Sequence, residues 1–195
     1  MNSSSILNFS KTQTECKPFP HFHCLSILQN GLETIVFNWF ENTSLWYLTK
    51  TDFYEQYEFD FLNAELPVDI NCLIEDDCLA TIKENIQMNL HVSAIELVGI
   101  AAHKLVNGHR IGIHNDFINN EETHRLVIHI NPHWQEQNGG VLMLFNSYEA
   151  SDLNKLVNPI QNSAFAFEIS PKSYHAVSRI YNSSRYTIIY TFRKV

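Results

Sequence analysis

A histidine and an aspartate lie two residues apart in the stretch RIGIHNDFINN, which covers residues 110–120. In an extended strand, side chains two positions apart face the same side, so His114 and Asp116 are expected to share one face. Ile111 and Ile113 share the other face, which we expect to pack on a core. An imidazole and a carboxylate that converge from one face of a strand can supply two ligands to a metal ion.

A third ligand has to come from elsewhere in the chain, and His175 in SPKSYHAVSRI is the candidate. Two histidines and one carboxylate form a facial triad with open coordination positions, which suits non-heme Fe(II) oxygenases. Arg185 follows at the start of the predicted strand RYTIIYTFRKV. A hairpin between these two segments would bring its guanidinium near the metal, where a fixed fork of donors suits the distal end of a dicarboxylate.

The residues alone leave other interpretations open. In a chain with ten histidines, a His-x-Asp tripeptide also arises by chance, and such a histidine can simply bond a turn carboxylate. Arg185 can equally be a surface charge at the start of a strand. A decision between these alternatives depends on the elements that surround the residues.

The second half of the sequence is typical of antiparallel strands. After residue 94, short segments rich in β-branched and aromatic residues follow one another: AIELVGIAAHKL, HRIGIHND, HRLVIHIN, GGVLMLF, AFAFEIS and RYTIIYTFRKV. Turn signals such as Asn-Gly, Asn-Gly-Gly and Asn-Ser-Ser separate them. Because closure protects strand edges, we expect two sheets closed as a jelly roll, the cupin-like double-stranded β-helix.

The first half is less regular. The stretch LIEDDCLATIKENIQMNL predicts a helix, with Leu79, Ile82, Ile86 and Leu90 at three- and four-residue spacing. Residues 1–15 are polar and lack a period, so they predict a loose terminus. The length suits one domain over residues 1–195. In this division, residues 16–93 give helical and strand support, and residues 94–195 form the jelly-roll core of a mostly β fold.

Composition narrows the classes of partner and compartment. Thirteen basic residues against twenty-one acidic ones give a formal charge of −8, which argues against a nucleic-acid partner. No apolar run approaches the roughly 20 residues that span a bilayer, so we expect no membrane insertion. The four cysteines form no CxxC pair, and nothing N-terminal resembles a signal peptide, which predicts a cytoplasmic protein with free thiols. The sequence carries no signal for an oligomeric state.

Three segments together resemble the 2-oxoglutarate and Fe(II)-dependent dioxygenases, specifically their prolyl 4-hydroxylase-like branch. These segments are HRIGIHND, HRLVIHINPHWQEQNGGVLMLF and AFAFEISPKSYHAVSRIYNSSRYTIIYTF, within residues 95–193. Four features occur in the expected order: a His-x-Asp, a strand ending in Ile-Asn-Pro-x-Trp, a Gly-Gly that opens the next strand, and a distal His followed by Arg. The N-terminal segment PFPHFHCLSIL is also similar to the entry strand of that branch.

The resemblance implies a role for each matching position. His114, Asp116 and His175 match the iron ligands, and Arg185 matches the residue that pairs with the distal carboxylate of 2-oxoglutarate. Fe(II), 2-oxoglutarate and dioxygen are the implied cofactor and co-substrates. The implied reaction couples oxidative decarboxylation of 2-oxoglutarate to hydroxylation of a C–H bond. Halogenating relatives have a small residue where this chain has Asp116, so hydroxylation is the expected outcome.

Two positions depart from the pattern of many relatives. His103 and His129 stand where tyrosines often line the co-substrate pocket. A neutral imidazole can donate a hydrogen bond to a carboxylate much as a phenol does, whereas a charged one would add pH dependence near neutrality. The alternative for His129 is that it fills a polar gap.

Substrate identity is less constrained. The branch acts on peptidyl residues in many members and on free amino acids or natural products in others. We expect a peptide or protein side chain as substrate, as for a tailoring enzyme of a ribosomally made peptide. The alternatives are a tailoring hydroxylase of a free amino acid or small natural product, and a non-catalytic metal-binding jelly-roll module. An open groove formed by the loops before Arg110 and at residues 119–122 would favour the peptide, and a deep pocket the small molecule.

Overall fold

Two antiparallel sheets make up the body of the protein. In the computed structural model, which describes residues 6–195, the large sheet has eight strands in the order β1 (Thr12–Glu15), β2 (His21–Leu25), β10 (Ser163–Glu168), β7 (His124–His129), β12 (Ser184–Lys194), β5 (Ile95–Val106), β4 (Glu55–Asp60) and β3 (Tyr47–Lys50). The small sheet has the order β6 (Ile111–His114), β11 (His175–Val177), β8 (Leu142–Phe145) and β9 (Leu153–Val157). The predicted two-sheet jelly roll is confirmed.

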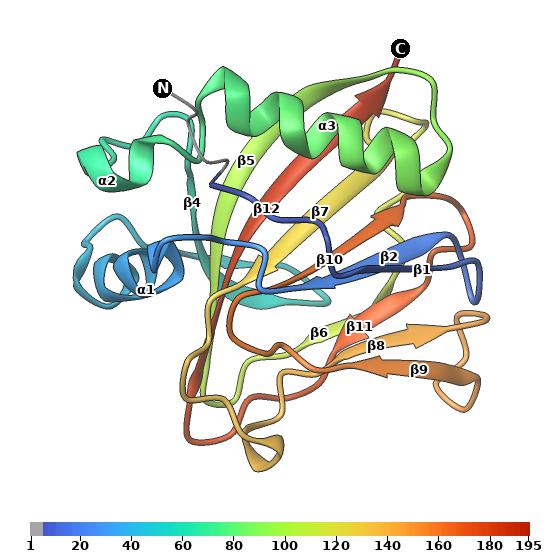
Figure 1. Ribbon diagram of the computed structural model, residues 1–195. Coiled ribbons are helices and arrows are strands. Elements are labelled where there is room, and N and C mark those ends of the chain that lie inside the picture. The colour runs from blue at the N-terminus through green and yellow to red at the C-terminus, as the bar shows by residue number, and fades with distance from the viewer. Residues whose placement is uncertain (1–5) are drawn as a thin grey trace.

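Helices cover the face of the large sheet that points away from the small sheet (Figure 1). They are α1 (Leu32–Asn42), α2 (Val68–Asn71) and α3 (Asp76–Leu90), and a 3-10 helix, η1 (Glu136–Asn138), precedes β8. The predicted helix is α3, which contacts β2, β5 and β10. The buried residues of this helix are Cys78, Ile82, Ile86 and Leu90, which recur every four residues. Cys78 therefore takes the place on the inner face that was expected for Leu79, which is partly buried. No helix within residues 6–195 is long and apolar enough to cross a membrane.

Helix α1 was not assigned from the sequence, although its core stripe is visible there. Leu32, Val36 and Phe40 recur every four residues, and all three are buried. Gly31 precedes the helix with φ of 74°, a left-handed conformation that glycine adopts without steric cost. The strand-rich context of this region obscured the helical period.

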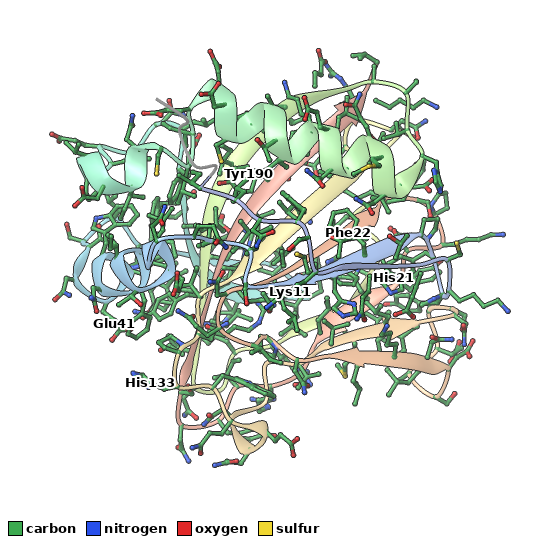
Figure 2. All side chains as sticks on the ribbon, viewed as in Figure 1. Lys11, His21, Phe22, Glu41, His133 and Tyr190 are labelled. Carbon is green, nitrogen blue, oxygen red and sulfur yellow. The ribbon has the colours of Figure 1, made fainter. Side chains whose placement is uncertain are left out.

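The core consists of two clusters, one on each face of the large sheet. The first lies beneath the helices and includes Phe22 and Tyr190, which are labelled in Figure 2. The second lies between the two sheets and is built around Leu105, Phe165 and Val177. Strand alternation therefore decides which side chains reach the space between the sheets.

The expectation of a loose terminus over residues 1–15 is wrong for residues 6–15. Leu7 is buried in the first core cluster, and β1 pairs with β2 from Thr12 to Glu15. The polar composition of this segment suits an edge strand, since no residue of β1 is buried while its backbone completes a ladder. The rest of that prediction concerns residues 1–5, which lie outside the described part of the chain.

Candidate metal centre

The pairing of β6 with β11 brings the two candidate histidine ligands together. His114 and His175 are directly opposed in this antiparallel pair, so their side chains leave the same face of the small sheet. Their ring centroids are 4.2 Å apart. The ring of Phe53 packs against His114 and the ring of Phe167 against His175, which fixes both imidazoles in position.

Both histidines present the same nitrogen to the space between the sheets. Nδ1 of His114 lies 2.9 Å from the carbonyl oxygen of Gly112, and Nδ1 of His175 lies 2.8 Å from that of Ser173. A carbonyl can only accept, so Nδ1 carries the proton in each ring and Nε2 is left with its lone pair. This arrangement is typical of metal-binding histidines, whose second nitrogen is held by a backbone or carboxylate oxygen.

Asp116 reaches the same point by a different route from the one predicted. Strand β6 ends at His114, and Asp116 lies beyond it with a left-handed φ of 59°. The expectation that both side chains leave one strand face is therefore wrong, because the chain turns before Asp116. A bond from Ser173 Oγ to the carbonyl of Asn115 ties this turn to the loop before β11.

The three candidate ligands nevertheless converge. Nε2 of His114 is 3.3 Å from Asp116 Oδ1, and Nε2 of His175 is 3.2 Å from Asp116 Oδ2. Their ligand atoms all lie within 4.8 Å of one another. Ile111 and Ile113 were both expected to pack on a core. Ile111 packs against the cluster between the sheets, whereas Ile113 is only half-buried.

The electrostatics of the centre favour an ionised Asp116 and a neutral His175. Burial by itself raises the pKa of Asp116, but the nearby Arg125 guanidinium outweighs it and holds that pKa well below its usual range. Burial lowers the pKa of His175 despite the adjacent carboxylate. These are the protonation states that metal ligation requires.

Arg185 lies on the facing sheet. Strand β12 pairs with β5 and β7 in the large sheet, so the expected hairpin between the segments of His175 and Arg185 is wrong. The side chain is only 6% exposed, Nε has no hydrogen-bond partner, and no carboxylate within residues 6–195 forms an ion pair with it. Burial alone lowers its pKa to about 10. A buried guanidinium without a counter-ion is costly, so the site is suited to a bound anion.

A row of polar side chains crosses the large sheet beside Arg185. Thr187 is opposed to His129 on β7 and to His103 on β5, and His103 is opposed to Glu58 on β4. Opposed residues share a face, and Arg185 shares it too because it lies two residues from Thr187. The row faces the space between the sheets, which the small sheet closes from the other side.

The histidines in this row are neutral. Burial and the Arg185 charge hold the pKa of His129 well below its usual range, and burial together with Arg125 and Arg185 lowers the pKa of His103 to about 3. His129 is fully buried, and neither ring nitrogen has a partner among the described residues; the hydroxyl of Thr187 is also unpaired. Three neighbouring polar groups, on Arg185, His129 and Thr187, thus have polar atoms that no described residue satisfies.

The same face carries a cavity at the other end of β12. Thr191 lies four residues beyond Thr187, about 13 Å along the strand, and is opposed to Arg125 on β7. A cavity of about 300 Å³ opens here. Its lining residues are Tyr47, Glu58, Phe59, Asp60, Val98, Gly99, Ile100, Ala101, Glu122, Arg125 and Thr191. Since Arg125 also contacts Asp116, the cavity adjoins the three converging ligands.

Sequence reasoning missed Arg125 and Thr187. Each could have been found from strand alternation alone: Arg125 and Val127 share a face with His129 in HRLVIH, and Thr187 shares a face with Arg185 in RYTIIY. A charged residue on the buried face of a central strand is rarely without a function or a partner.

Comparisons with known proteins agree with this geometry. A model of the 2OG-Fe(II) oxygenase superfamily matches residues 100–193. A prolyl-4-hydroxylase from Pseudomonas putida is similar in structure, with a TM-score of 0.70 at 14% identity, over 90% of this chain and 92% of that one. A prolyl hydroxylase from Trichoplax adhaerens, in complex with a hypoxia inducible factor peptide fragment, gives a TM-score of 0.71 at 14% identity, over 89% and 83% of the two chains. No curated protein matches the sequence.

Residues 100–193 match the 2OG-Fe(II) oxygenase superfamily, and the fold of the chain is that of the prolyl 4-hydroxylase-like enzymes. It is a 2-oxoglutarate-dependent dioxygenase, for which the family implies Fe(II), 2-oxoglutarate and dioxygen. The residues present fit these groups, because the His-Asp-His donor set suits Fe(II) and the unpaired polar atoms around Arg185 suit a carboxylate.

Proposed function

We propose that the protein hydroxylates an unactivated C–H bond of a peptidyl or protein side chain, with Fe(II) held by His114, Asp116 and His175. The observation that carries this proposal is the convergence of three ligand atoms within 4.8 Å, with both Nε2 atoms free to ligate. When bound, Fe(II) and 2-oxoglutarate activate dioxygen, and one oxygen atom enters the substrate while 2-oxoglutarate becomes succinate and carbon dioxide.

Arg185 pairs with the distal carboxylate of 2-oxoglutarate in this proposal. The neutral imidazole of His129 and the hydroxyl of Thr187 donate to the same group, since all three side chains share one buried face and lack partners. His103 is a weaker candidate, because its Nε2 already lies 3.8 Å from Glu58 Oε2. The carboxylate would neutralise the buried guanidinium, which provides affinity without a conformational change.

The remaining residues orient these groups and exclude water. Gly112 and Ser173 fix the tautomers of the two histidines through their carbonyls. The aromatic rings of Phe53 and Phe167 cover the imidazoles from two sides. Aromatic cover of this kind limits the access of water to the two imidazoles.

The shape of the adjoining cavity supports a peptide substrate. Tyr47, Asp60 and Val98 line it and are exposed, so it is an open depression rather than an enclosed pocket. Strand β3, which contributes Tyr47, is an edge strand of the large sheet, and its outer backbone edge can pair with an extended chain. A free amino acid or small natural product is the second candidate, favoured by the modest volume of about 300 Å³.

The first test is an anaerobic absorption titration with Fe(II) and then 2-oxoglutarate. We expect the weak visible charge-transfer band of an Fe(II)–2-oxo acid complex in the wild type, and no band in His175→Ala or Asp116→Ala. Arg185→Ala should need at least about 10-fold more 2-oxoglutarate, equivalent to roughly 1.5–3 kcal/mol for a charge-assisted contact. Arg193→Ala removes an exposed arginine from the same strand and serves as the control.

If the wild type binds iron but shows no charge-transfer band with 2-oxoglutarate, a non-catalytic metal-binding module would describe the protein better. An unchanged 2-oxoglutarate requirement in Arg185→Ala would mean that another residue holds the carboxylate.

We further propose that residues 1–195 act as one oxygenase domain in a reducing cytoplasmic compartment. The packing of α1 and α3 on the large sheet supports the first point. The second is supported by Cys16, Cys24, Cys72 and Cys78, which are all free thiols.

A further inference from the structure

Arg125 has an unusual place for a charged side chain. It lies on β7, a central strand of the large sheet, and its side chain is only 17% exposed. One arm of the guanidinium donates to Asp116, with Nη1 2.6 Å from Oδ2. The other arm donates to Glu122, with Nη2 2.5 Å from Oε2. Arg125 thus links a candidate metal ligand to a carboxylate at the edge of the cavity.

Asp116 depends on such a link more than its two fellow ligands do. His114 and His175 are held by strand pairing and by hydrogen bonds to backbone carbonyls. Asp116 lies beyond the end of β6 with φ of 59°, so no strand pairing holds it in place. Among the contacts of the described residues, Arg125 gives the Asp116 carboxylate its shortest bond.

The two carboxylate oxygens of Asp116 are not equivalent. Oδ2 accepts the bond from Arg125 and lies 3.2 Å from His175 Nε2. Oδ1 lies 3.3 Å from His114 Nε2 and accepts no hydrogen bond from the guanidinium among the described residues. An oxygen already engaged by a cationic donor is a poorer metal ligand than its free neighbour.

We propose that Arg125 is a positioning residue for the metal: it engages Asp116 Oδ2, so that Oδ1 alone is offered to the ion and the other coordination positions stay open. The inference rests on the proposed iron site at His114, Asp116 and His175. Arg125 would act through Asp116 and not on the reacting atoms, as groups that orient metal ligands commonly do. Glu122 in turn holds the second arm of the guanidinium and offsets its charge.

The two possible roles of Arg125, positioning of Asp116 and simple charge compensation, predict opposite changes in metal affinity when Arg125 is removed. A guanidinium near a dication repels it, so if Arg125 only compensated the charge of Asp116, its removal would strengthen metal binding. If Arg125 fixes the carboxylate, its removal weakens metal binding, because Asp116 then has to be ordered by the metal itself. The sign of the change in metal affinity therefore decides between the two roles.

The experiment measures the Mn(II) affinity of the full-length protein. Electron paramagnetic resonance reports the concentration of free Mn(II), and no catalytic turnover is needed. Arg125→Gln should bind Mn(II) about 10- to 100-fold more weakly than the wild type. Arg125→Lys keeps the positive charge but lacks the two-armed guanidinium, so its Mn(II) affinity should lie between those of Arg125→Gln and the wild type. Arg193→Gln makes the same substitution at an exposed arginine of β12; it is the matched control and should change the affinity less than about threefold.

Equal or tighter Mn(II) binding by Arg125→Gln would overturn the inference while leaving the iron site intact. Absence of Mn(II) binding by the wild type would instead contradict the proposed function itself. If Arg125→Gln does not fold, Arg125→Lys decides alone, and wild-type affinity in that variant would exclude positioning by the fork. Thermal unfolding of each metal-free variant checks that the fold is retained.

Discussion

At the scale of single residues, the site contains polar groups that are hydrogen-bonded within the protein and others that are buried without a hydrogen-bond partner. The imidazoles of His114 and His175 are fixed by backbone carbonyls before any ligand arrives. His129 and Arg185, on the facing sheet, bury polar atoms that have no partner among the described residues. A buried polar atom without a hydrogen bond lowers the free energy of unfolding by about 1–3 kcal/mol. A bound carboxylate could accept these missing hydrogen bonds and restore the lost stability.

His129→Phe tests this trade-off. The substitution keeps a flat ring and removes both unpaired nitrogens, so the unliganded protein should become more stable, by about 1 kcal/mol or more, while the 2-oxoglutarate requirement rises several-fold. Urea unfolding without ligand and 2-oxoglutarate titration of the Fe(II) protein measure the two effects. If His129 only fills a polar gap, the 2-oxoglutarate requirement will not change.

At the scale of elements, the approach to β8 controls the space around Arg185. Gly139 and Gly140 both have positive φ, as the expected tight turn requires. A Cβ at Gly140 would lie 2.6 Å from Cδ1 of Ile180 and 3.0 Å from Cδ of Arg185. The absence of a side chain at Gly140 therefore gives the arginine its path into the space between the sheets.

Gly140→Ala should weaken both the fold and the co-substrate site. We expect a loss of about 2–4 kcal/mol in the free energy of unfolding, from the positive φ and the overpacking together, and a higher 2-oxoglutarate requirement as Arg185 is displaced. Gly31→Ala is the control, since Gly31 has φ of 74° but open space around its Cβ direction. Urea unfolding of both variants gives the comparison. Equal losses, with unchanged 2-oxoglutarate binding, would show that Arg185 does not depend on this glycine.

At the scale of the whole molecule, burial of histidines makes stability depend on pH. His124 is 4% exposed on β7, and burial, with a smaller effect of Lys194, lowers its pKa to about 4. The unfolded chain binds this proton with a pKa near 6.5, so it takes up more protons than the folded one between about pH 6.5 and 4. The stability present above pH 6.5 is therefore lost as the pH falls through this window.

The expected size of this effect follows from the two pKa values. Between pH 7 and pH 5 the wild type should lose about 2 kcal/mol more than His124→Gln, which cannot take up the proton. Urea unfolding at pH 7, 6 and 5 measures the difference. Parallel losses in both proteins would mean that His124 titrates normally in the folded state.

Much of the architecture could be read from the sequence. Alternation in HRLVIH and AFAFEIS predicted strands, and these segments are β7 and β10. The four-residue spacing of Ile82, Ile86 and Leu90 predicted α3. These elements were predictable because their periods reflect contacts within one segment and with a single buried face. Strand β1 and helix α1 were not, because their order depends on the neighbours against which they pack.

The sequence by itself determined the candidate ligands His114, Asp116 and His175, the candidate anchor Arg185, and the sheet-rich class of the fold. Only the tertiary structure decided how they meet. Asp116 turns out of its strand, and Arg185 arrives from the facing sheet instead of through a hairpin. The partnership of Asp116 with Arg125 likewise depends on the closure of two sheets. Local periodicity reports which face a side chain takes, but the pairing of faces from distant segments is a property of the whole folded chain.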